Sequence, residues 1–345
     1  MELLAAHLFE RNLRRERRYR DPLDPLQVCD EHLLRHYRMP RHEILRLCDE
    51  LSPLLSRATK RAHAIPTHTQ VLVTLRFLAS GTFQNVIADT TGLTQPSVSR
   101  IISSVTNILY EKAKMEIKMP TNIYDVNRTA AAFSFIGGFP RVIGAIDCTH
   151  IPIKAPIENE HIYVNRKSFH SLNVQVICNA EMLITSFSVK YPGATNDAFI
   201  WRNCPLRDRF EAGTFRDFHL LGDCGYPLEP YLLTPFHDPM TEGERQYNRS
   251  HKTTRVIIEQ TFGVLKSRFR CLHRSGGSLQ YDPKKCAKIA ATCMWLHNRC
   301  IRRRIPMIAP VGNDDGMNND NDIIHGDHNP TGQDVRREIV EGFFT

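Results

Sequence analysis

Residues 141–154 read RVIGAIDCTHIPIK, and this stretch decides the fold that we expect. Residues 142–146 have the apolar character of a buried β-strand, yet Asp147 is set into the same run. A buried strand has no structural use for an unpaired charge, because desolvating a carboxylate is costly. Asp147 is therefore either paired with a cation in the core or part of a functional site.

Three further acidic residues stand in apolar or glycine-rich surroundings: Asp197 in YPGATNDAFIW, Asp223 in HLLGDCGYPL and Glu259 in TTRVIIEQTFGVLKSRFRCL. Phosphodiester hydrolysis needs a deprotonated water, a stabilised phosphoryl group and a neutralised leaving oxygen, and two divalent ions about 3.5–4 Å apart supply all three. Without metal, clustered carboxylates would repel one another and raise each other's pKa values. We therefore expect these four acids to meet around Mg²⁺ or Mn²⁺, and activity to require added metal.

The helix expected over residues 254–269 places Glu259 beside basic residues. Arg255 lies four residues before Glu259 and Lys266 seven residues after it, so acid and bases share one stripe of the helix. Gly263, one turn after Glu259, leaves room for a phosphate backbone. The alternative is an ordinary salt bridge between Arg255 and Glu259 on an exposed helix.

Further basic residues occur in HIYVNRKSFHSLN, between the first expected strand and the next. Arg166, Lys167 and His170 are close to Asp147 in sequence and could receive the scissile or neighbouring phosphates. A solvated loop is the alternative for this segment.

Residues 1 to about 125 have helical patterns and almost no strand signal. Within them, FQNVIADTTGLTQPSVSRIISSVTNIL predicts a helix-turn-helix at about residues 83–109, with Gly92 in the turn and Thr94 as the cap of the second helix. Such units present the polar face of the second helix to the DNA major groove. Here that face consists of Gln95, Ser97, Ser99 and Arg100. A plain helical hairpin in a bundle is the alternative.

Strand signals begin after a link around residues 120–127. The expected strands are 141–153, 172–178, 183–190 and 219–221, and the expected helices are 198–203, 254–269 and 283–303. This mixture indicates an α/β layer, which we assign to a nuclease domain over residues 126–305. Residues 306–345 are expected to be a mostly disordered acidic, Asn-rich tail with a short terminal helix over 333–343.

The bulk composition favours an anionic partner without proving one. Lys and Arg number 45 against 37 Asp and Glu, for a formal charge of +8 and a pI near 9.0. The arginines within residues 14–20 favour a solvated helix face over a nuclear-import or nucleic-acid segment. The amino-terminal sequence fits neither a secretory nor a transit signal, and no run is long enough to cross a membrane.

The ten cysteines are scattered, without a CxxC pair, and several lie in apolar runs, as reduced buried thiols do. We therefore expect an intracellular compartment. Cys293, His297 and Cys300 in CMWLHNRC share one helical face but supply only three ligands and no characteristic zinc spacing. Core packing is the favoured interpretation.

The blocks AIDCTHIPI, YVNRKSFHSLNVQ, YPGATNDAF, LLGDCGYPL and YNRSHKTTRVIIEQTFGVLKSRFRCL occur in this order. Together they resemble the PIF/Harbinger superfamily of DDE transposases, above all its domesticated, transposase-derived nucleases, over about residues 30–305. The resemblance implies an RNase H-like mixed sheet flanked by helices and preceded by an all-α helix-turn-helix region. It also implies divalent metal held by Asp147, Asp223 and Glu259, with Asp197 as a further acid. Whether Asp197 or Asp223 is the middle catalytic acid stays open.

The sequence departs from the family pattern at three positions. Asn196 and Ala198 flank Asp197 where transposons often have His and Ser, and Cys224 follows Asp223 where Ser is common. These residues lie beside the acids. We therefore expect the differences to affect the metal affinity and the reaction rate rather than whether the site is present.

The resulting interpretation is a nuclease that cuts DNA by water attack. Asp147, Asp223 and Glu259 bind the ions and Asp197 assists, while Arg166, Lys167, Arg255 and Lys266 steer the strand. The alternatives are a catalytically silent DNA-binding or adaptor protein and an active transposase whose nucleophile is a 3′ hydroxyl. The resemblance also implies a Myb-like (SANT-type) DNA-binding partner and residence in nucleus and cytoplasm; the oligomeric state stays open.

Overall fold

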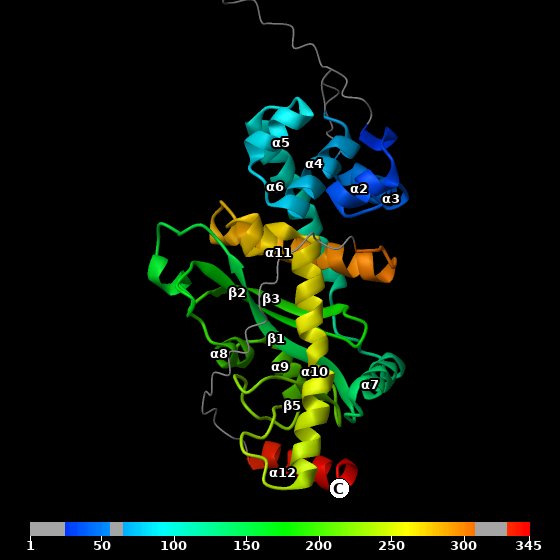
Figure 1. Cartoon of the computed structure of the whole chain (residues 1–345), viewed down its shortest axis with the longest axis vertical. Coiled ribbons are helices and arrows are strands. Elements are labelled where there is room, and N and C mark those ends of the chain that lie inside the picture. Colours follow the sequence, from blue (N-terminus) through cyan, green and yellow to red (C-terminus); the bar gives the residue numbers. More distant parts are fainter. Residues whose placement is uncertain (1–24, 56–64, 308–329) are drawn as a thin grey trace, which may run out of the picture.

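The computed structural model describes residues 25–55, 65–307 and 330–345 (Figure 1). The arginines of residues 14–20 and most of the predicted tail, residues 308–329, lie outside the described residues. The amino-terminal part is helical, with a short 3₁₀ turn at Pro25–Gln27 and five helices. These are α2 (Asp30–Tyr37), α3 (Arg41–Leu55), α4 (Thr67–Ser80), α5 (Gln84–Thr91) and α6 (Gln95–Glu116).

Helices α5 and α6 cover the segment in which a helix-turn-helix was expected. Residues 92–94 join them, and Gly92 adopts a left-handed φ of 67°, which glycine adopts without strain. Helix α6 extends to Glu116, seven residues beyond the predicted end at residue 109. Thr94 is the N-cap residue of α6, as predicted, but its hydroxyl contacts Ser97 Oγ at 3.0 Å and does not accept a backbone N–H. A DNA-binding role for this pair stays a prediction.

The link predicted around residues 120–127 is partly helical. Helix α7 spans Ile123–Gly137 and begins where Asn122 Oδ1 accepts a hydrogen bond of 2.7 Å from Asp125 N. The predicted boundary between residues 125 and 126 therefore falls inside a helix.

A five-stranded mixed sheet follows. Its strands are β1 (Val142–Pro152), β2 (Ser171–Cys178), β3 (Ile184–Pro192), β4 (His219–Leu221) and β5 (Leu232–Leu233). The spatial order is β3-β2-β1-β4-β5, in which β1 runs antiparallel to β2 and parallel to β4. The four expected strands are present; the two-residue β5 is too short for a periodicity signal.

Strand β1 is much longer than β4. Beyond Ala145, the edge of β1 on the side of β4 therefore has no neighbouring strand among the described residues, and we call this edge the free flank of β1. Strand β4 pairs with β1 only from Val142 to Ala145, whereas β2 continues to pair with β1 as far as Pro152. Asp147 therefore lies on β1 just beyond the carboxyl end of β4. Sites in mixed and parallel sheets form at such carboxyl ends.

Helices cover both faces of the sheet (Figure 1). They are α8 (Asp197–Arg202), α9 (Pro205–Glu211), α10 (Glu242–Arg268), α11 (Pro283–Arg302) and α12 (Pro330–Phe343). Buried residues of α8 and α9 pack with Ile143 and Ile146 of β1, whereas buried residues of α10 and α11 pack with Val142 and Ala145. The sheet is therefore the middle layer of three.

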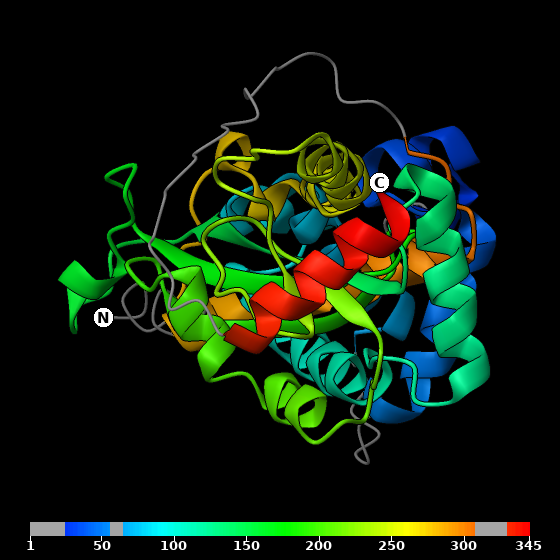
Figure 2. The ribbon, with the colours of Figure 1, turned by 90° about the horizontal axis from the view of Figure 1, so that it is seen from below.

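Helix α10 begins twelve residues before the predicted start at residue 254. Thr241 and Glu244 form a capping box, in which Glu244 N donates to Thr241 Oγ1 and Thr241 N donates to Glu244 Oε2. The carboxy-terminal helix is present from Pro330, and it lies at the end of the molecule opposite to α2–α6 (Figures 1 and 2).

The helical part and the sheet share one continuous core, which runs from Leu33 of α2 to Val340 of α12. Helix α11 connects them, because its Lys285 donates to Ser103 of α6 at 2.8 Å and its Asn298 bonds both backbone groups of Ile184 in β3. In the part of the chain described, no helix has both the length and the apolar character of a membrane span.

Candidate metal centre

Three of the four predicted acids meet at the free flank of β1. Asp147, Asp197 and Asp223 each offer a carboxylate oxygen, and these oxygens all lie within 4.8 Å of one another. They come from β1, from the first position of α8 and from the segment that follows β4. Within the described ranges, this is the one group of three or more acids, histidines or cysteines close enough to share a metal ion.

Asp147 is held by two contacts. Its Oδ1 accepts a hydrogen bond of 2.7 Å from Cys148 N, and its Oδ2 lies 3.0 Å from Arg255 Nη1. Burial, followed by the negative charge of Asp223, raises the pKa of Asp147 to about 7, although Arg255 acts in the opposite direction. The carboxylate therefore lacks sufficient positive charge around it.

Asp197 opens α8, where the partial positive charge of a helix amino terminus favours an acid. Asn196 precedes it as the cap, with Oδ1 accepting from Phe199 N at 2.7 Å. Asn173 of β2 orients the Asp197 carboxylate by donating to its Oδ1 at 3.0 Å. Burial, followed by the charge of Asp223, raises the pKa of Asp197 as well.

Asp223 follows β4 by two residues, after Gly222. Its Oδ1 accepts a hydrogen bond of 3.0 Å from Gly225 N, which closes a tight turn beside Asp197. Since β4 ends level with Ala145, this turn brings Asp223 to Asp147 across the free flank. Three chain segments that are distant in sequence thus supply one cluster of oxygen atoms.

Glu259 lies outside this cluster. Its Oε1 is 2.6 Å from Arg255 Nη2, so the salt bridge considered as the alternative is present. The pair is not an ordinary exposed one, however, because only 18% of the Arg255 side chain is exposed and its other nitrogen contacts Asp147. A role of Glu259 as metal ligand stays a prediction.

The predicted phosphate contacts divide into two groups. The charge of Arg166 acts on the pKa of Asp197, so Arg166 is near the carboxylates. Lys266 Nζ donates to His150 O at 3.1 Å, three residues beyond Asp147 on β1. Burial, followed by the charges of Lys266, Lys167 and Arg166, lowers the pKa of His150 to about 4. His170, in contrast, contacts Glu160 Oε1 at 2.9 Å.

Two contributors to the centre were not expected from the sequence, Asn173 and Tyr226. The Tyr226 hydroxyl is buried and lies 3.3 Å from Cys148 Sγ, next to Asp147. A signal for Asn173 was available, since Asn173 and Gln175 are polar residues in a strand that is buried throughout.

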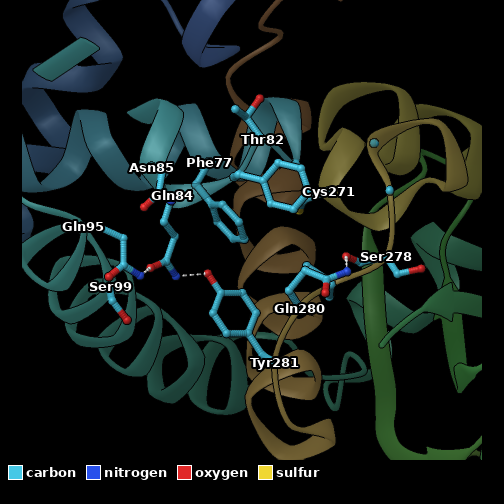
Figure 3. A pocket seen from close by; sticks show the side chains of 15 residues that line it. Phe77, Thr82, Gln84, Asn85, Gln95, Ser99, Cys271, Ser278, Gln280 and Tyr281 are labelled. Atoms are coloured by element: carbon cyan, nitrogen blue, oxygen red, sulfur yellow. Dashed lines mark hydrogen bonds between the residues drawn. The ribbon is translucent and has the colours of Figure 1, made fainter. Parts of the chain in front are cut away.

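The polar residues of α6 lie away from the carboxylates. Gln95 and Ser99 line a groove of about 370 Å³ between α4–α6 and residues 276–281 (Figure 3). In it, Gln95 Nε2 donates to Gln84 Oε1 at 2.7 Å, and Gln84 Nε2 donates to the Tyr281 hydroxyl. Arg100 is exposed and donates to Ser97 Oγ at 3.3 Å. The pair α5–α6 is thereby attached to the segment that pairs with the end of β1.

Among the residues that the structure describes, the cysteines take part in no second group of potential metal ligands. All ten are free thiols, and Cys293 and Cys300 are completely buried. His297 Nε2 donates to Met182 O at 2.8 Å. Core packing, as expected, accounts for this set.

Comparison with known proteins identifies relatives over most of the chain. Residues 146–298 match the family model described as DDE superfamily endonuclease. The chain is 41% identical to the human protein named "Putative nuclease HARBI1" over 82% of this chain and 83% of the relative. The Xenopus laevis protein of the same name is 35% identical, over 83% and 82% of the two chains.

A more distant relative is the Arabidopsis thaliana "Protein ALP1-like", which is 27% identical over 66% of this chain and 59% of the relative. No solved structure matches the chain.

Proposed function

Because the chain belongs to the Harbinger transposase-derived DDE superfamily endonucleases, we propose that it is a divalent-metal-dependent nuclease that hydrolyses DNA phosphodiester bonds. The observation that carries the proposal is the group of three carboxylates within 4.8 Å. The strand order β3-β2-β1-β4-β5, with helices on both faces, supports an RNase H-like frame for this group.

The three carboxylates fit a divalent cation. All donor atoms are oxygens, which Mg²⁺ and Mn²⁺ prefer, and the raised pKa values of Asp147 and Asp197 reflect a repulsion that a cation would relieve. Asp147, Asp197 and Asp223 would hold the ion, with Glu259 as a further ligand once Arg255 releases it. When bound, such an ion activates water and stabilises charge on the phosphoryl group.

The surrounding side chains would position the substrate. Arg166 places positive charge near Asp197, and Lys266 places it beside His150 on the same strand as Asp147, so both can attract a phosphate backbone. Asn173 fixes the orientation of Asp197, and Arg255 holds Asp147 while no metal is bound. The exposed amino-terminal residues of α6 add a second surface for DNA at the far side of the groove.

A catalytically silent DNA-binding or adaptor protein is the second candidate. The specific observation in its favour is that Arg255 already bridges Asp147 and Glu259, so an internal cation occupies part of the site. The Myb-like partner and the residence in nucleus and cytoplasm stay predictions, as does strand transfer by an active transposase.

Nicking of supercoiled plasmid separates the candidates. We expect wild-type protein to nick in Mn²⁺ or Mg²⁺ but not in EDTA, and Asp147→Asn and Asp223→Asn to be inactive. Asp208→Asn changes an exposed carboxylate on α9 and should retain activity. Tight DNA binding without metal-dependent nicking, with and without a Myb-like protein, would favour the silent adaptor.

A further inference from the structure

Four arginines converge where the end of α2 meets α4 and the end of α10. They are Arg38, Arg76, Arg268 and Arg270, which we call the arginine cluster. Arg268 Nη1 donates to Arg38 O at 3.3 Å, and Arg76 Nη1 contacts Nδ1 of His36, two residues before Arg38. The four side chains come from three segments that are far apart in the sequence, so tertiary packing brings their charges together.

No carboxylate from the described residues forms an ion pair with the arginine cluster. Arg38 donates to Arg35 O at 2.9 Å, Arg268 to Ile305 O at 3.0 Å and Arg270 to Ser275 Oγ at 2.7 Å. These are neutral acceptors.

Arg299, elsewhere in the core, shows how the same fold neutralises a buried arginine. Its guanidinium pairs with both Glu43 and Glu50. The arginine cluster lacks this arrangement.

Two of the arginines also have unused donors. Arg268 is only 3% exposed, and its Nε is buried without a hydrogen-bond partner among the described residues. Arg38 Nε is buried and unpartnered in the same way. Buried polar groups are normally satisfied, and charged ones most of all, so these donors call for an acceptor that the described residues do not supply.

The carboxy terminus of α2 does not balance the cluster. A helix end carries about half a negative charge, which favours a nearby cation, and Arg38 is the C-cap residue of α2. The positive charge of four guanidinium groups is several times larger than this partial negative charge. Burial, followed by the charges of Arg270, Arg268 and Arg76, lowers the pKa of Arg38, which agrees with an uncompensated positive field.

We propose that the arginine cluster is a binding site for a phosphate group. Guanidinium groups donate paired hydrogen bonds that match phosphate oxygens, and a doubly charged anion would neutralise the cluster and satisfy the unused Nε donors. The phosphate belongs either to a nucleic-acid backbone or to a small phosphorylated molecule. This site does not depend on nuclease activity.

The site is separate from the carboxylates. Arg268 lies thirteen residues after Arg255 on the same helix, which corresponds to about 20 Å. It lies nine residues after Glu259, which is two and a half turns, so the two side chains project from opposite sides of α10. A phosphate held here is therefore not the one that is cleaved.

The first test is thermal unfolding in EDTA, in inorganic phosphate and in chloride at equal ionic strength. We expect phosphate to raise the Tm of the wild type by about 2 °C or more. Arg76→Gln should abolish this gain, yet should not lower the Tm in chloride, because it removes one of several mutually repelling charges. Arg270→Gln is the second variant, and Arg128→Gln on α7, exposed and paired with Asp125, is the matched control.

The proposal is overturned if phosphate does not raise the Tm of the wild type above its value in chloride. It is also overturned if Arg76→Gln keeps the same rise in Tm as the control Arg128→Gln. The source of the phosphate follows from duplex DNA affinity in EDTA at several salt concentrations. If Arg76→Gln reduces the salt slope by about 0.9, the ligand is the nucleic-acid backbone. If it leaves the slope unchanged but loses the phosphate gain, the ligand is a small phosphorylated molecule. Both results support the site.

Discussion

Arg255 Nη1 of α10 lies 3.0 Å from Asp147 Oδ2 of β1. The second terminal nitrogen of Arg255 lies 2.6 Å from Glu259, so one guanidinium holds two of the acids that were expected to bind metal. A divalent ion at Asp147 would therefore have to compete with a cation that the protein itself supplies. Whether Arg255 stays bound to Asp147 and Glu259 therefore determines how tightly the centre can bind a metal ion.

Arg255→Gln should lower stability in EDTA and raise metal affinity. Without Arg255, Asp147 and Glu259 lose a partly buried partner, at a cost of about 1–3 kcal/mol in the free energy of unfolding. Mn²⁺ would then meet less competition, so calorimetry should show tighter binding. The control is Arg245→Gln, which removes an exposed ion pair between Arg245 and Glu242 on the same helix. Weaker Mn²⁺ binding would contradict the competition.

Asp147→Asn should remove both the metal-dependent gain in Tm and one pH dependence of stability. The pKa of Asp147 is about 7 in the folded state against 3.8 for the ordinary group, so the folded state binds more protons between these values. In EDTA, this group therefore makes the protein less stable as the pH rises from about 4 to 7, by on the order of 4 kcal/mol. Urea unfolding of wild type and variant across this window gives the difference. Parallel pH profiles would refute it.

His251 should make the protein sensitive to acid. It is 2% exposed, its Nε2 donates to Leu233 O at 3.2 Å, and burial lowers its pKa to about 3. Its neutral form stabilises the fold fully above the unfolded pKa of about 6.5, and this contribution is lost as the pH falls towards 3. Between pH 7.5 and 5, the loss is about 2 kcal/mol. His251→Gln should show a correspondingly smaller fall in urea midpoint; an equal fall would exclude His251 as a cause.

Gly263→Ala should stabilise the protein but impair DNA cleavage. Gly263 is exposed inside α10, and a Cβ there would meet no atom within 4 Å, so alanine should raise stability by about 0.5–1 kcal/mol. A methyl group would nevertheless obstruct a phosphate backbone that approaches the helix beside Glu259. At Gly243, in the first turn of the same helix, a Cβ would lie 3.0 Å from Val340 and 3.1 Å from Phe344 O, so this close approach should offset the gain that alanine brings at Gly263. Full nicking activity of Gly263→Ala would show that DNA does not approach there.

Arg100→Gln should weaken DNA binding if α5–α6 is a DNA-binding helix-turn-helix. The side chain is exposed near the start of α6, so its loss should lower the salt slope by about 0.9 without changing the Tm. Arg337→Gln on α12, at the opposite end of the molecule, is the control. Equal affinities of the two variants, measured by fluorescence anisotropy in EDTA, would favour a plain helical hairpin.

Local patterns predicted most elements, and they failed where a helix is stabilised by its context. The residues of α6 show an apolar face throughout residues 98–109, and β1 begins with an apolar run at residues 142–146, so both were recognised. The first half of α10, from Glu242 to His251, is largely polar and has little apolar periodicity. A capping box at its start and contacts with α12 stabilise it, and the second of these depends on residues 330–345.

The sequence by itself determined the acids, their order and the elements that carry them, because an acid in an apolar strand is costly wherever the strand is placed. Only the tertiary structure decided which acids meet. Strand β4 ends level with Ala145 and turns Asp223 towards Asp147, while Asn173 directs Asp197 to the same point. Glu259 is instead bound to Arg255 one helical turn away. Distances of a few ångströms between carboxylates result from strand lengths and helix packing, which no local pattern contains.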